Sequence, residues 1–409
     1  MRQVIDQLPG SKIREVANAG LGRNDVLPFW FGESDEPTPA FIRDAAIRSL
    51  NEGETFYAHN LGLPELREAL SAYIGTLHRA VNAERIAVTS SGVNALMLAM
   101  QALAGPGDEV VAVVPVWPNL TSQPAILGAT VKRVSLQVRG GAWQLDMAAL
   151  LSAITSKTNV LLVNAPNNPT GWTLTRAEQE TILAHCRRTG TWIVADEVYE
   201  RVYFKPGSAP VAEPPQGGRT PPRGAGAAGD VGAPSCAPSF LDIAEPDDRL
   251  VVAHSFSKSF LMTGWRLGWL VMPPALTEAI GKLVEFNTSC APVFVQRAGL
   301  AALAGAVDFV PGLVQRLQHC RDTLLPQLAT LPGVQVATPE GGMYAFFRVE
   351  GHDDSLAFAK RLVVEAGLGL APGAAFGDEA EGWLRWCFAS NDPQRLTLGV
   401  ERLKRFLGL

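Results

Sequence analysis

The sequence has no excess of positive charge, no long apolar run and no signal peptide, and each absence narrows the range of functions. Its formal net charge is −5, which argues against nucleic acid as a partner, because such proteins present a basic face. No apolar run approaches the ~18 residues that are needed to span a bilayer, which argues against a membrane protein. Residues 1–6 lack the apolar core of a signal peptide, so we expect a cytoplasmic protein.

Cysteine and histidine are also few and dispersed. The five cysteines include no C-x-x-C pair, and an odd, scattered set is typical of reduced thiols in a reducing compartment. None of the six histidines has metal-ligand spacing, and His185 and His319 fall within helical patterns. The sequence therefore predicts neither a disulfide framework nor a metal site.

The chain has the ordinary composition of a globular enzyme, with 47% hydrophobic and 18% charged residues. Its 409 residues are too many for one simple core, so about two domains are expected. From about residue 86 to 275, short β-rich runs alternate with helical patterns. The strand candidates are 85–89, 109–114, 160–164, 191–195 and 250–253, and the helices between them include 93–103 and 176–188. This alternation predicts an α/β fold with a mostly parallel sheet, helices on both faces and ligands at the carboxyl ends of the strands.

A second unit follows this region. The pattern after about residue 286 predicts long helices at 294–304 and 309–328, strands at 333–337 and 344–349, and a final helix at 393–406. We therefore expect three parts. They are an N-terminal arm at 1–35 that contributes to the small domain, a large domain at 36–285, and a small α+β domain at 286–409.

Residues 205–238 differ from the rest of the large domain, because nearly half of them are Pro or Gly and few have large apolar side chains. Such a segment buries too little surface to offset its ordering entropy. The sequence predicts a flexible, inert surface insertion here, and a functional lid is the alternative.

One lysine, Lys258, stands among hydroxyl side chains in residues 255–266, directly after the predicted strand 250–253. An amine at a strand end can form a Schiff base, and Ser255 and Arg266 can hold an anion. Together they describe an anchor for a phosphorylated aldehyde cofactor, although lysines in polar loops are usually only solvated. The segment also resembles the lysine signature of the class I and II aminotransferases, which use pyridoxal 5'-phosphate (PLP).

Asp196 and Tyr199 follow the predicted strand 191–195. A carboxylate there can keep a ring nitrogen protonated, which makes a pyridine ring an electron sink, and Tyr199 can hydrogen-bond the ring's phenolate oxygen. From the residues alone, an N-capping aspartate and a packed tyrosine are the alternative. Asp-Glu-Val-Tyr after a buried strand is also similar to a second signature of the same family, which favours the cofactor roles.

Two loops extend the resemblance. The turn-rich sequence Asn-Ala-Pro-Asn-Asn-Pro-Thr-Gly at 164–171 resembles the family's N-x-P-x-N-P-T-G element, in which the residue matching Asn168 contacts the cofactor and the substrate carboxylate. Residues 89–94 link a strand to a helix, whose first backbone N–H groups can cradle a phosphate. The resemblance places Ser91, Gly92 and Val93 there, and a simple tight turn with a cap is the alternative.

Four further positions match the family. Trp117 occupies the position of the aromatic ring that stacks on the cofactor, although a core tryptophan is the competing interpretation. Arg385 matches the arginine that binds the substrate α-carboxylate as a fork. Gly32 matches a glycine that lets the backbone approach the substrate. Tyr57 resembles the tyrosine that reaches the cofactor phosphate of the neighbouring subunit, which implies a homodimer with shared active sites.

The resemblance to aspartate aminotransferase-like enzymes runs from about residue 26 to the end and is interrupted by the Pro/Gly-rich segment. It implies fold type I of the PLP-dependent transferases, with a mostly parallel, seven-stranded-type sheet. It also implies transfer of the amino group of an L-amino acid to a 2-oxo acid such as 2-oxoglutarate, through PLP bound to Lys258 as a Schiff base. Lys258 as acid–base catalyst, Asp196 and Tyr199 are then the catalytic residues.

One departure bears on the substrate. Val93 stands where some bacterial aspartate aminotransferases have a lysine that contacts the distal carboxylate of the substrate, so apolar or broad amino donors are expected. Two alternatives stay open. A β-elimination lyase of the cysteine-S-conjugate type shares these motifs. A non-catalytic sensor on the same fold is disfavoured, because only about 25 residues precede the resemblance and the chain is acidic.

Overall fold

The computed structural model describes residues 1–204 and 236–409. Its largest sheet has seven strands in the order β2-β10-β9-β8-β7-β3-β4. These strands are β2 (Ile86–Thr89), β3 (Glu109–Val114), β4 (Thr130–Ser135), β7 (Thr158–Asn164), β8 (Trp192–Asp196), β9 (Leu250–Ser255) and β10 (Gly268–Val271). All neighbours pair in parallel except β10, which is antiparallel to both β2 and β9. The predicted α/β class with a mostly parallel sheet is therefore confirmed.

Helices cover both faces of this sheet, as the continuous apolar strands predicted. Val110 and Ala112 of β3 belong to one buried cluster, together with side chains of α5, α6 and α10. Val111 and Val113 belong to a second cluster with side chains of α4, α7 and α8. These helices are α4 (Pro64–Gly75), α5 (Gly92–Leu103), α6 (Asn119–Leu127), α7 (Met147–Ala153), α8 (Arg176–Thr189) and α10 (Pro274–Thr288).

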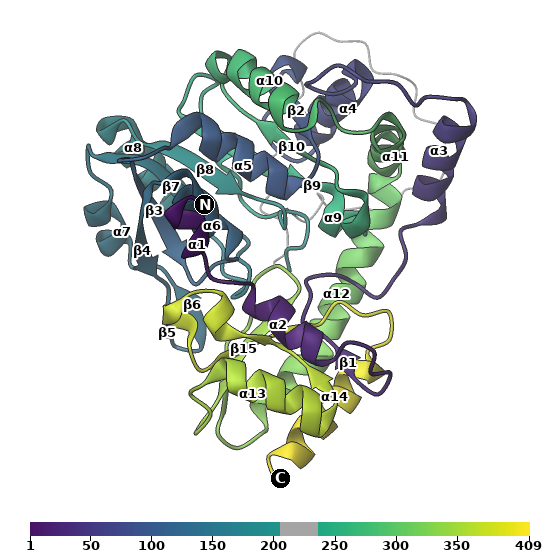
Figure 1. Cartoon of the computed structure of the whole chain (residues 1–409), viewed down its shortest axis with the longest axis vertical. Helices are drawn as coiled ribbons and strands as arrows, with labels where there is room; N and C mark the ends of the chain where they lie inside the picture. The colour runs from purple at the N-terminus through teal and green to yellow at the C-terminus, as the bar shows by residue number, and fades with distance from the viewer. Residues whose placement is uncertain (205–235) are drawn as a thin grey trace.

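A smaller layer occupies the lower part of the view in Figure 1. It contains the antiparallel sheet β11-β12-β15-β14, with β11 (Val334–Val336), β12 (Tyr344–Val349), β14 (Ala371–Pro372) and β15 (Trp383–Cys387). The helices beside it are α13 (Ser355–Arg361) and α14 (Gln394–Phe406). The long helix α12 (Ala306–Ala329) joins this layer to the upper part and packs on β11, β12 and α14.

The N-terminal residues return to the C-terminal layer. Strand β1 (Leu27–Pro28) pairs in parallel with β13 (Leu368–Gly369), and α2 (Lys12–Ala19) packs against β14 and α13. The remaining helices are α1 (Gln3–Asp6), α3 (Ala40–Asn51), α9 (Phe256–Ser259) and α11 (Val293–Ala304), and a hairpin joins β5 (Gln137–Arg139) to β6 (Ala142–Gln144). Short 3-10 turns lie at Ala83–Arg85, Phe240–Asp242, Thr263–Trp265, Gly373–Ala375 and Asp378–Ala380, and a π-helical turn lies at Leu362–Ala366.

Local chemistry explains where these elements begin and end. Helix α8 starts at a capping box, in which Thr175 and Glu178 bond reciprocally, and it ends at Gly190, whose φ of 75° suits a residue without a side chain. In the described part of the chain, no single helix is long and apolar enough to cross a membrane. Helices α11 and α12 meet that test only as a pair, by length and composition, and they are bent by 79°.

Most of the predicted Pro/Gly-rich insertion, residues 205–235, lies outside the described residues. Its last three residues, 236–238, were predicted to be flexible as well, and for them the prediction is wrong. Cys236 and Ala237 are buried, and the Ala237 backbone N–H donates to the carbonyl of Glu200 at 2.8 Å. Small side chains and a backbone hydrogen bond fix this stretch, although its composition resembles that of the segment before it.

Candidate active site

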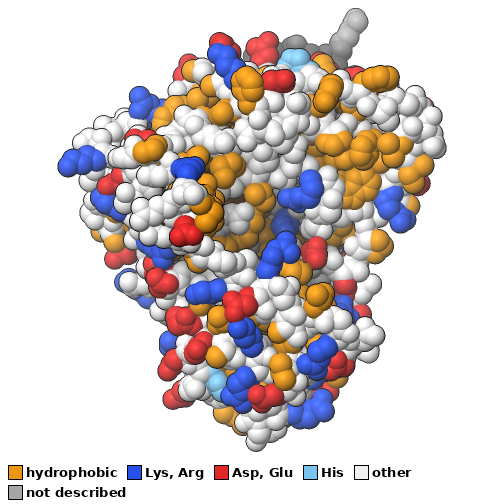
Figure 2. All heavy atoms as spheres, in the orientation of Figure 1, with side chains coloured by type: hydrophobic (Ala, Val, Ile, Leu, Met, Phe, Trp, Pro, Cys, Tyr) orange, Lys and Arg blue, Asp and Glu red, His pale blue; other side chains and the backbone are white. Residues whose placement is uncertain are grey.

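Three strands of the large sheet end side by side. The last residues of β7, β8 and β9 are Asn164, Asp196 and Ser255, and Asn164 is paired in register with Asp196. A cavity of about 450 Å³ lies at this edge, where the carboxyl ends of parallel strands place a binding site. Figure 2 shows the molecule hollowed near the middle of this face, with hydrophobic and basic side chains around the hollow.

Both the N-terminal arm and the C-terminal sheet contribute to the wall of the cavity. The lining residues are Ile13, Arg14, Phe31, Gly32, Glu33, Gly92, Val93, Leu96, Trp117, Asn164, Asn168, Asp196, Val198, Tyr199, Ser255, Ser257, Lys258, Thr263, Arg266, Tyr344 and Arg385. The cavity therefore needs the whole chain, from α2 to β15, to be complete.

Lys258 lies on the four-residue helix α9, and its Nζ donates to the carbonyl oxygen of Gly32 at 2.6 Å. A side chain at Gly32 would place its Cβ 2.1 Å from the Tyr344 hydroxyl, so only glycine can present its carbonyl here. Burial lowers the pKa of Lys258 to about 8, and the nearby positive charges of Arg385 and Arg266 act in the same direction. About one tenth of this amine is thus neutral, and nucleophilic, at pH 7, far more than for a lysine in water.

Asp196 is buried, and its carboxylate accepts a 3.3 Å hydrogen bond from the backbone N–H of Val198. Burial raises the pKa of Asp196 to about 7, while the Val198 hydrogen bond and the charge of Lys258 oppose this rise. A cation placed beside this carboxylate would stabilise its ionised form. Asp196 can therefore hold a protonated nitrogen at the base of the cavity.

Tyr199 and Tyr344 form a buried pair, with their hydroxyl oxygens 2.5 Å apart and their rings edge to face. Burial raises the pKa of Tyr199 well above its ordinary value, and Tyr344 adds to the rise. The Tyr199 hydroxyl is therefore neutral and can donate a hydrogen bond to an oxygen in the cavity.

Arg385 projects from β15 and is buried. One terminal nitrogen donates to Asn168 Oδ1 at 2.9 Å, the other donates to the Trp30 carbonyl at 2.5 Å, and Nε has no hydrogen-bond partner. Among the described residues, no carboxylate forms an ion pair with Arg385. A buried guanidinium without a counter-charge is costly, so this position favours an anionic ligand.

A second anion-binding element lies at the start of α5. Gly92 begins the helix, where the first backbone N–H groups have no acceptor within the helix, and it lines the cavity together with Ser255, Ser257 and Arg266. The Ser255 hydroxyl donates to Ser257 Oγ at 2.9 Å. Hydroxyls, helix N–H groups and a guanidinium form a suitable cradle for a phosphate.

The cavity brings together most of the residues that the sequence indicated. Those lining it are Gly32, Gly92, Val93, Trp117, Asn168, Asp196, Tyr199, Ser255, Lys258, Arg266 and Arg385. Ser91 is buried beside the cavity instead, where its hydroxyl accepts from the Asn94 N–H as the N-cap of α5. Tyr57 is 89% exposed and does not line the cavity of its own chain.

Several lining residues, among them Arg14, Phe31 and Thr263, had no role assigned from the sequence. The Arg14 guanidinium lies 5.7 Å from the centre of the Phe31 ring. No local motif marks Arg14, because α2 reaches the cavity only after the arm packs on the C-terminal layer. Ser257 also lines the cavity and was also assigned no role, but the Ser-x-Ser-Lys spacing around Lys258 could have indicated it.

The chain matches proteins of known family along nearly its whole length. A profile described as "Aminotransferase class I and II" matches residues 24–403. The aspartate aminotransferase of Thermotoga maritima is 31% identical over 408 residues, which cover 98% of each chain. The arginine–pyruvate transaminase of Pseudomonas aeruginosa is 30% identical over 386 residues, which cover 93% of this chain and 88% of that one. A mutant of the Thermus thermophilus aspartate aminotransferase superposes with a TM-score of 0.86 at 28% identity, with 99% of both chains covered.

Proposed function

The chain belongs to the class I and II aminotransferase family, and from this premise we propose that Lys258 carries PLP and moves the proton during amino transfer. The observation that carries the proposal is the position of the Lys258 amine. It lies in one cavity with the Asp196 carboxylate and with Arg385, a buried guanidinium that forms no ion pair with a carboxylate of residues 1–204 or 236–409. The family and the aminotransferase activity are those that the sequence predicted.

The residues of the cavity fit PLP. Gly92, Ser255, Ser257 and Arg266 would hold its phosphate, and Trp117 would face its ring. Asp196 would hold the proton of the ring nitrogen and Tyr199 would hydrogen-bond the ring oxygen, with Asn168 beside it. When bound, PLP supplies an aldehyde for an amine and an electron sink for the negative charge that develops at the substrate α-carbon.

Side chains of the protein would bind the substrate and transfer the proton. Arg385 binds the substrate α-carboxylate as a fork, and Asn168, which already accepts from it at 2.9 Å, fixes its orientation. Lys258 would take the proton from the substrate α-carbon as a base and give it back as an acid. Asp196 would stay ionised and hold the proton of the ring nitrogen.

The walls of the cavity support apolar or broad amino donors. Ile13, Phe31, Val93 and Leu96 present apolar side chains, and Val93 cannot bind a distal carboxylate. We propose 2-oxoglutarate as the acceptor, with Arg14 as the cation for its second carboxylate. Arg14 is exposed, lines the cavity and, among the described residues, forms no ion pair. The relatives carry names for both acidic and basic donors, which suits a family with variable side-chain pockets.

We also propose a homodimer whose sites are shared, and a cytoplasmic location. Large apolar side chains are exposed at Phe41, Phe56, Tyr57, Phe286 and Val307. Hydrophobic side chains gather over the region of α3 and α11 in Figure 2, which is typical of an interface. All five cysteines are free, as expected in a reducing compartment.

The proposal is tested by locating the cofactor and by titrating donors. Borohydride reduction of the PLP-loaded protein followed by peptide mass mapping should place the cofactor on Lys258. L-amino acids that act as donors should change the absorption spectrum. The Lys258→Ala variant should bind PLP only non-covalently and turn over no substrate.

Other outcomes would contradict the assignment. A 2-oxo acid formed without any acceptor would indicate a β-elimination lyase, and a bound cofactor whose spectrum no donor changes would indicate a sensor. A label on another lysine, or near-native rates in Lys258→Ala, would exclude the role of Lys258.

A further inference from the structure

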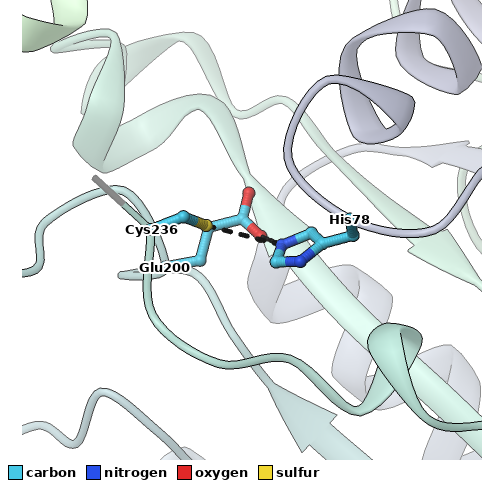
Figure 3. Close-up of side chains that lie close together, drawn as sticks. All are labelled: His78, Glu200 and Cys236. Carbon is cyan, nitrogen blue, oxygen red and sulfur yellow. Dashed lines mark hydrogen bonds and ion pairs between the residues drawn. The ribbon is translucent and has the colours of Figure 1, made fainter. Parts of the chain in front are cut away.

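A second group of reactive side chains lies outside the cavity, in a buried cluster formed by three separate segments. His78 follows α4, Glu200 follows β8, and Cys236 is the first described residue after position 235. All three are buried. Figure 3 shows the imidazole of His78 directed at both the Glu200 carboxylate and the Cys236 sulfur.

The distances within this cluster suit a shared cation. His78 Nε2 lies 3.1 Å from Glu200 Oε2 and 3.5 Å from Cys236 Sγ, and one donor atom of each residue lies within 4.8 Å of the others. In a tetrahedral zinc site, with Zn–N near 2.0 Å and Zn–S near 2.3 Å, neighbouring ligand atoms are roughly 3.3–3.7 Å apart. The two distances from His78 Nε2 therefore differ from that geometry by no more than a few tenths of an ångström.

The other ring nitrogen of His78 is already oriented. Its Nδ1 lies 3.1 and 3.2 Å from the two carboxylate oxygens of Asp242. A carboxylate that accepts from one nitrogen of a histidine directs the lone pair of the other nitrogen outward, as is usual for metal-bound histidines. Here that lone pair points at Glu200 and Cys236, so a proton or a metal ion must lie between them.

An independent observation comes from His254 on β9. It is 1% exposed and stacks on Trp269. In the described part of the chain neither of its ring nitrogens has a hydrogen-bond partner, although Nδ1 lies 3.6 Å from the same Glu200 oxygen. Glu197, Glu200 and His254 also form a group whose donor atoms lie within 4.8 Å of one another. Burying an imidazole without hydrogen bonds is costly, so a ligand beside His254 and the shared carboxylate is favoured.

We propose that His78 Nε2, Cys236 Sγ and the Glu200 carboxylate bind one Zn²⁺ ion, with Asp242 as the outer carboxylate and His254 bordering the open position. Nitrogen, thiolate and carboxylate form the donor set that zinc prefers. One Zn²⁺ that displaces the Nε2 proton of a His78 imidazolium and the thiol proton of Cys236 leaves the charge of the buried cluster unchanged. The two protons are released to solvent.

Such an ion would join three segments of the chain and keep one coordination position open. The segments are the end of α4, the residues after β8 and the stretch that begins at Cys236. The same segments carry catalytic side chains, since Asp196 and Tyr199 precede Glu200 and Ser255 follows His254. The sequence could not indicate this site, because its ligands are 122 and 158 positions from His78.

The test uses the full-length, PLP-loaded enzyme, stripped with a chelator and titrated with Co²⁺. Wild type should bind one equivalent per chain, with visible d–d bands and a thiolate-to-cobalt charge-transfer band in the difference spectrum. Cys236→Ser should lose the charge-transfer band, and Cys320→Ser, which alters another buried thiol, should keep it. Asp242→Asn should weaken Zn²⁺ binding roughly 10- to 100-fold in competition with a chromophoric chelator.

The wild-type titration decides the proposal even if a variant fails to fold. Zinc measured by mass spectrometry should approach one ion per chain, and added Zn²⁺ should raise the Tm of wild type but not of Cys236→Ser. No stoichiometric Co²⁺ or Zn²⁺ uptake by wild type would overturn the proposal. The cluster would then be a hydrogen-bonded imidazolium between Glu200 and Asp242. A charge-transfer band that survives in Cys236→Ser would overturn it as well.

Discussion

At the scale of single residues, the surroundings of Lys258 make its reactivity depend on pH near neutrality. Its pKa is lowered from 10.5 to about 8, mainly by burial. Covalent uptake of PLP needs the neutral amine, so the uptake rate of the cofactor-free enzyme should rise about tenfold per pH unit below 8 and level off above it. Stopped-flow absorbance at constant ionic strength measures this rate.

The same shift has a thermodynamic consequence of defined sign. Between about pH 8 and 10.5 the unfolded chain binds the Lys258 proton and the folded chain does not, so the free energy of unfolding of the cofactor-free enzyme should rise with pH. Lys258→Met lacks this titration and is the matched control. An uptake rate that still climbs steeply at pH 10 would mean that the amine is not perturbed.

Arg385 is the second residue with a defined expectation. Arg385→Lys keeps the charge but loses the planar fork that contacts Asn168 and Trp30, so kcat/KM for amino donors should fall roughly 10- to 100-fold. Arg348→Lys on the neighbouring strand β12, where the side chain bonds Gln335 at the surface, should leave it unchanged. Equal losses in both variants would argue against a specific carboxylate contact.

These residues also show what a sequence reveals about a site. Lys258, Asp196 and Asn168 could be predicted, because each stands in a run of consecutive residues at the end of a buried strand. Arg14 and Tyr344 carry no such local pattern, since packing between distant segments alone brings them to the cavity. The zinc ligands are hidden for the same reason. The roles assigned to the predicted residues, including Tyr57, stay predictions until the variants are measured.

At the scale of elements, apolar runs located most of the sheet. The bounds of β3 and β12 were predicted to the residue, and β7, β8 and β9 to within two positions. Strand β10 was missed, because it is only four residues long and lies close after the lysine loop. A short strand that is antiparallel on both sides is defined by its neighbours, β2 and β9, more than by its own composition.

The buried residues Cys236 and Ala237 allow a prediction at the scale of elements. Removing residues 208–232 should leave activity and Tm largely unchanged, because no described contact is lost. Extending the deletion through Ala237 should lower the Tm by roughly 5 °C or more, because two buried side chains and the bond to Glu200 are removed. Differential scanning calorimetry measures the Tm of both deletion variants. An equal Tm in the two would show that Cys236 and Ala237 are not needed for stability.

At the scale of the whole molecule, the exposed aromatic side chains support the proposed homodimer. Phe56 and Tyr57 are 84% and 89% exposed and precede α4, the helix that ends near His78. Aromatic residues so exposed are rare on monomers and common in interfaces. A second copy of the chain would bury them and bring Tyr57 to the phosphate end of the neighbouring cavity.

Mixed dimers can test whether Tyr57 acts across the interface. Lys258→Ala and Tyr57→Ala chains, co-expressed with different affinity tags and purified through both, should contain one fully intact site and show about half of the wild-type activity. The intact site combines Lys258 of one chain with Tyr57 of the other.

The reverse pairing is the control that distinguishes the two arrangements. This control dimer pairs one wild-type chain with one chain that carries both substitutions. Its only intact Lys258 and its only intact Tyr57 are then on the same chain. If Tyr57 serves the partner's cavity, this dimer should show about half of the activity of the Tyr57→Ala homodimer, because its one remaining lysine then faces an alanine. If Tyr57 served the cavity of its own chain, the control dimer would have the one intact site and about half of the wild-type activity. The dimer of the two single variants would then have no intact site. Sedimentation of the wild type as a monomer would exclude a shared site altogether.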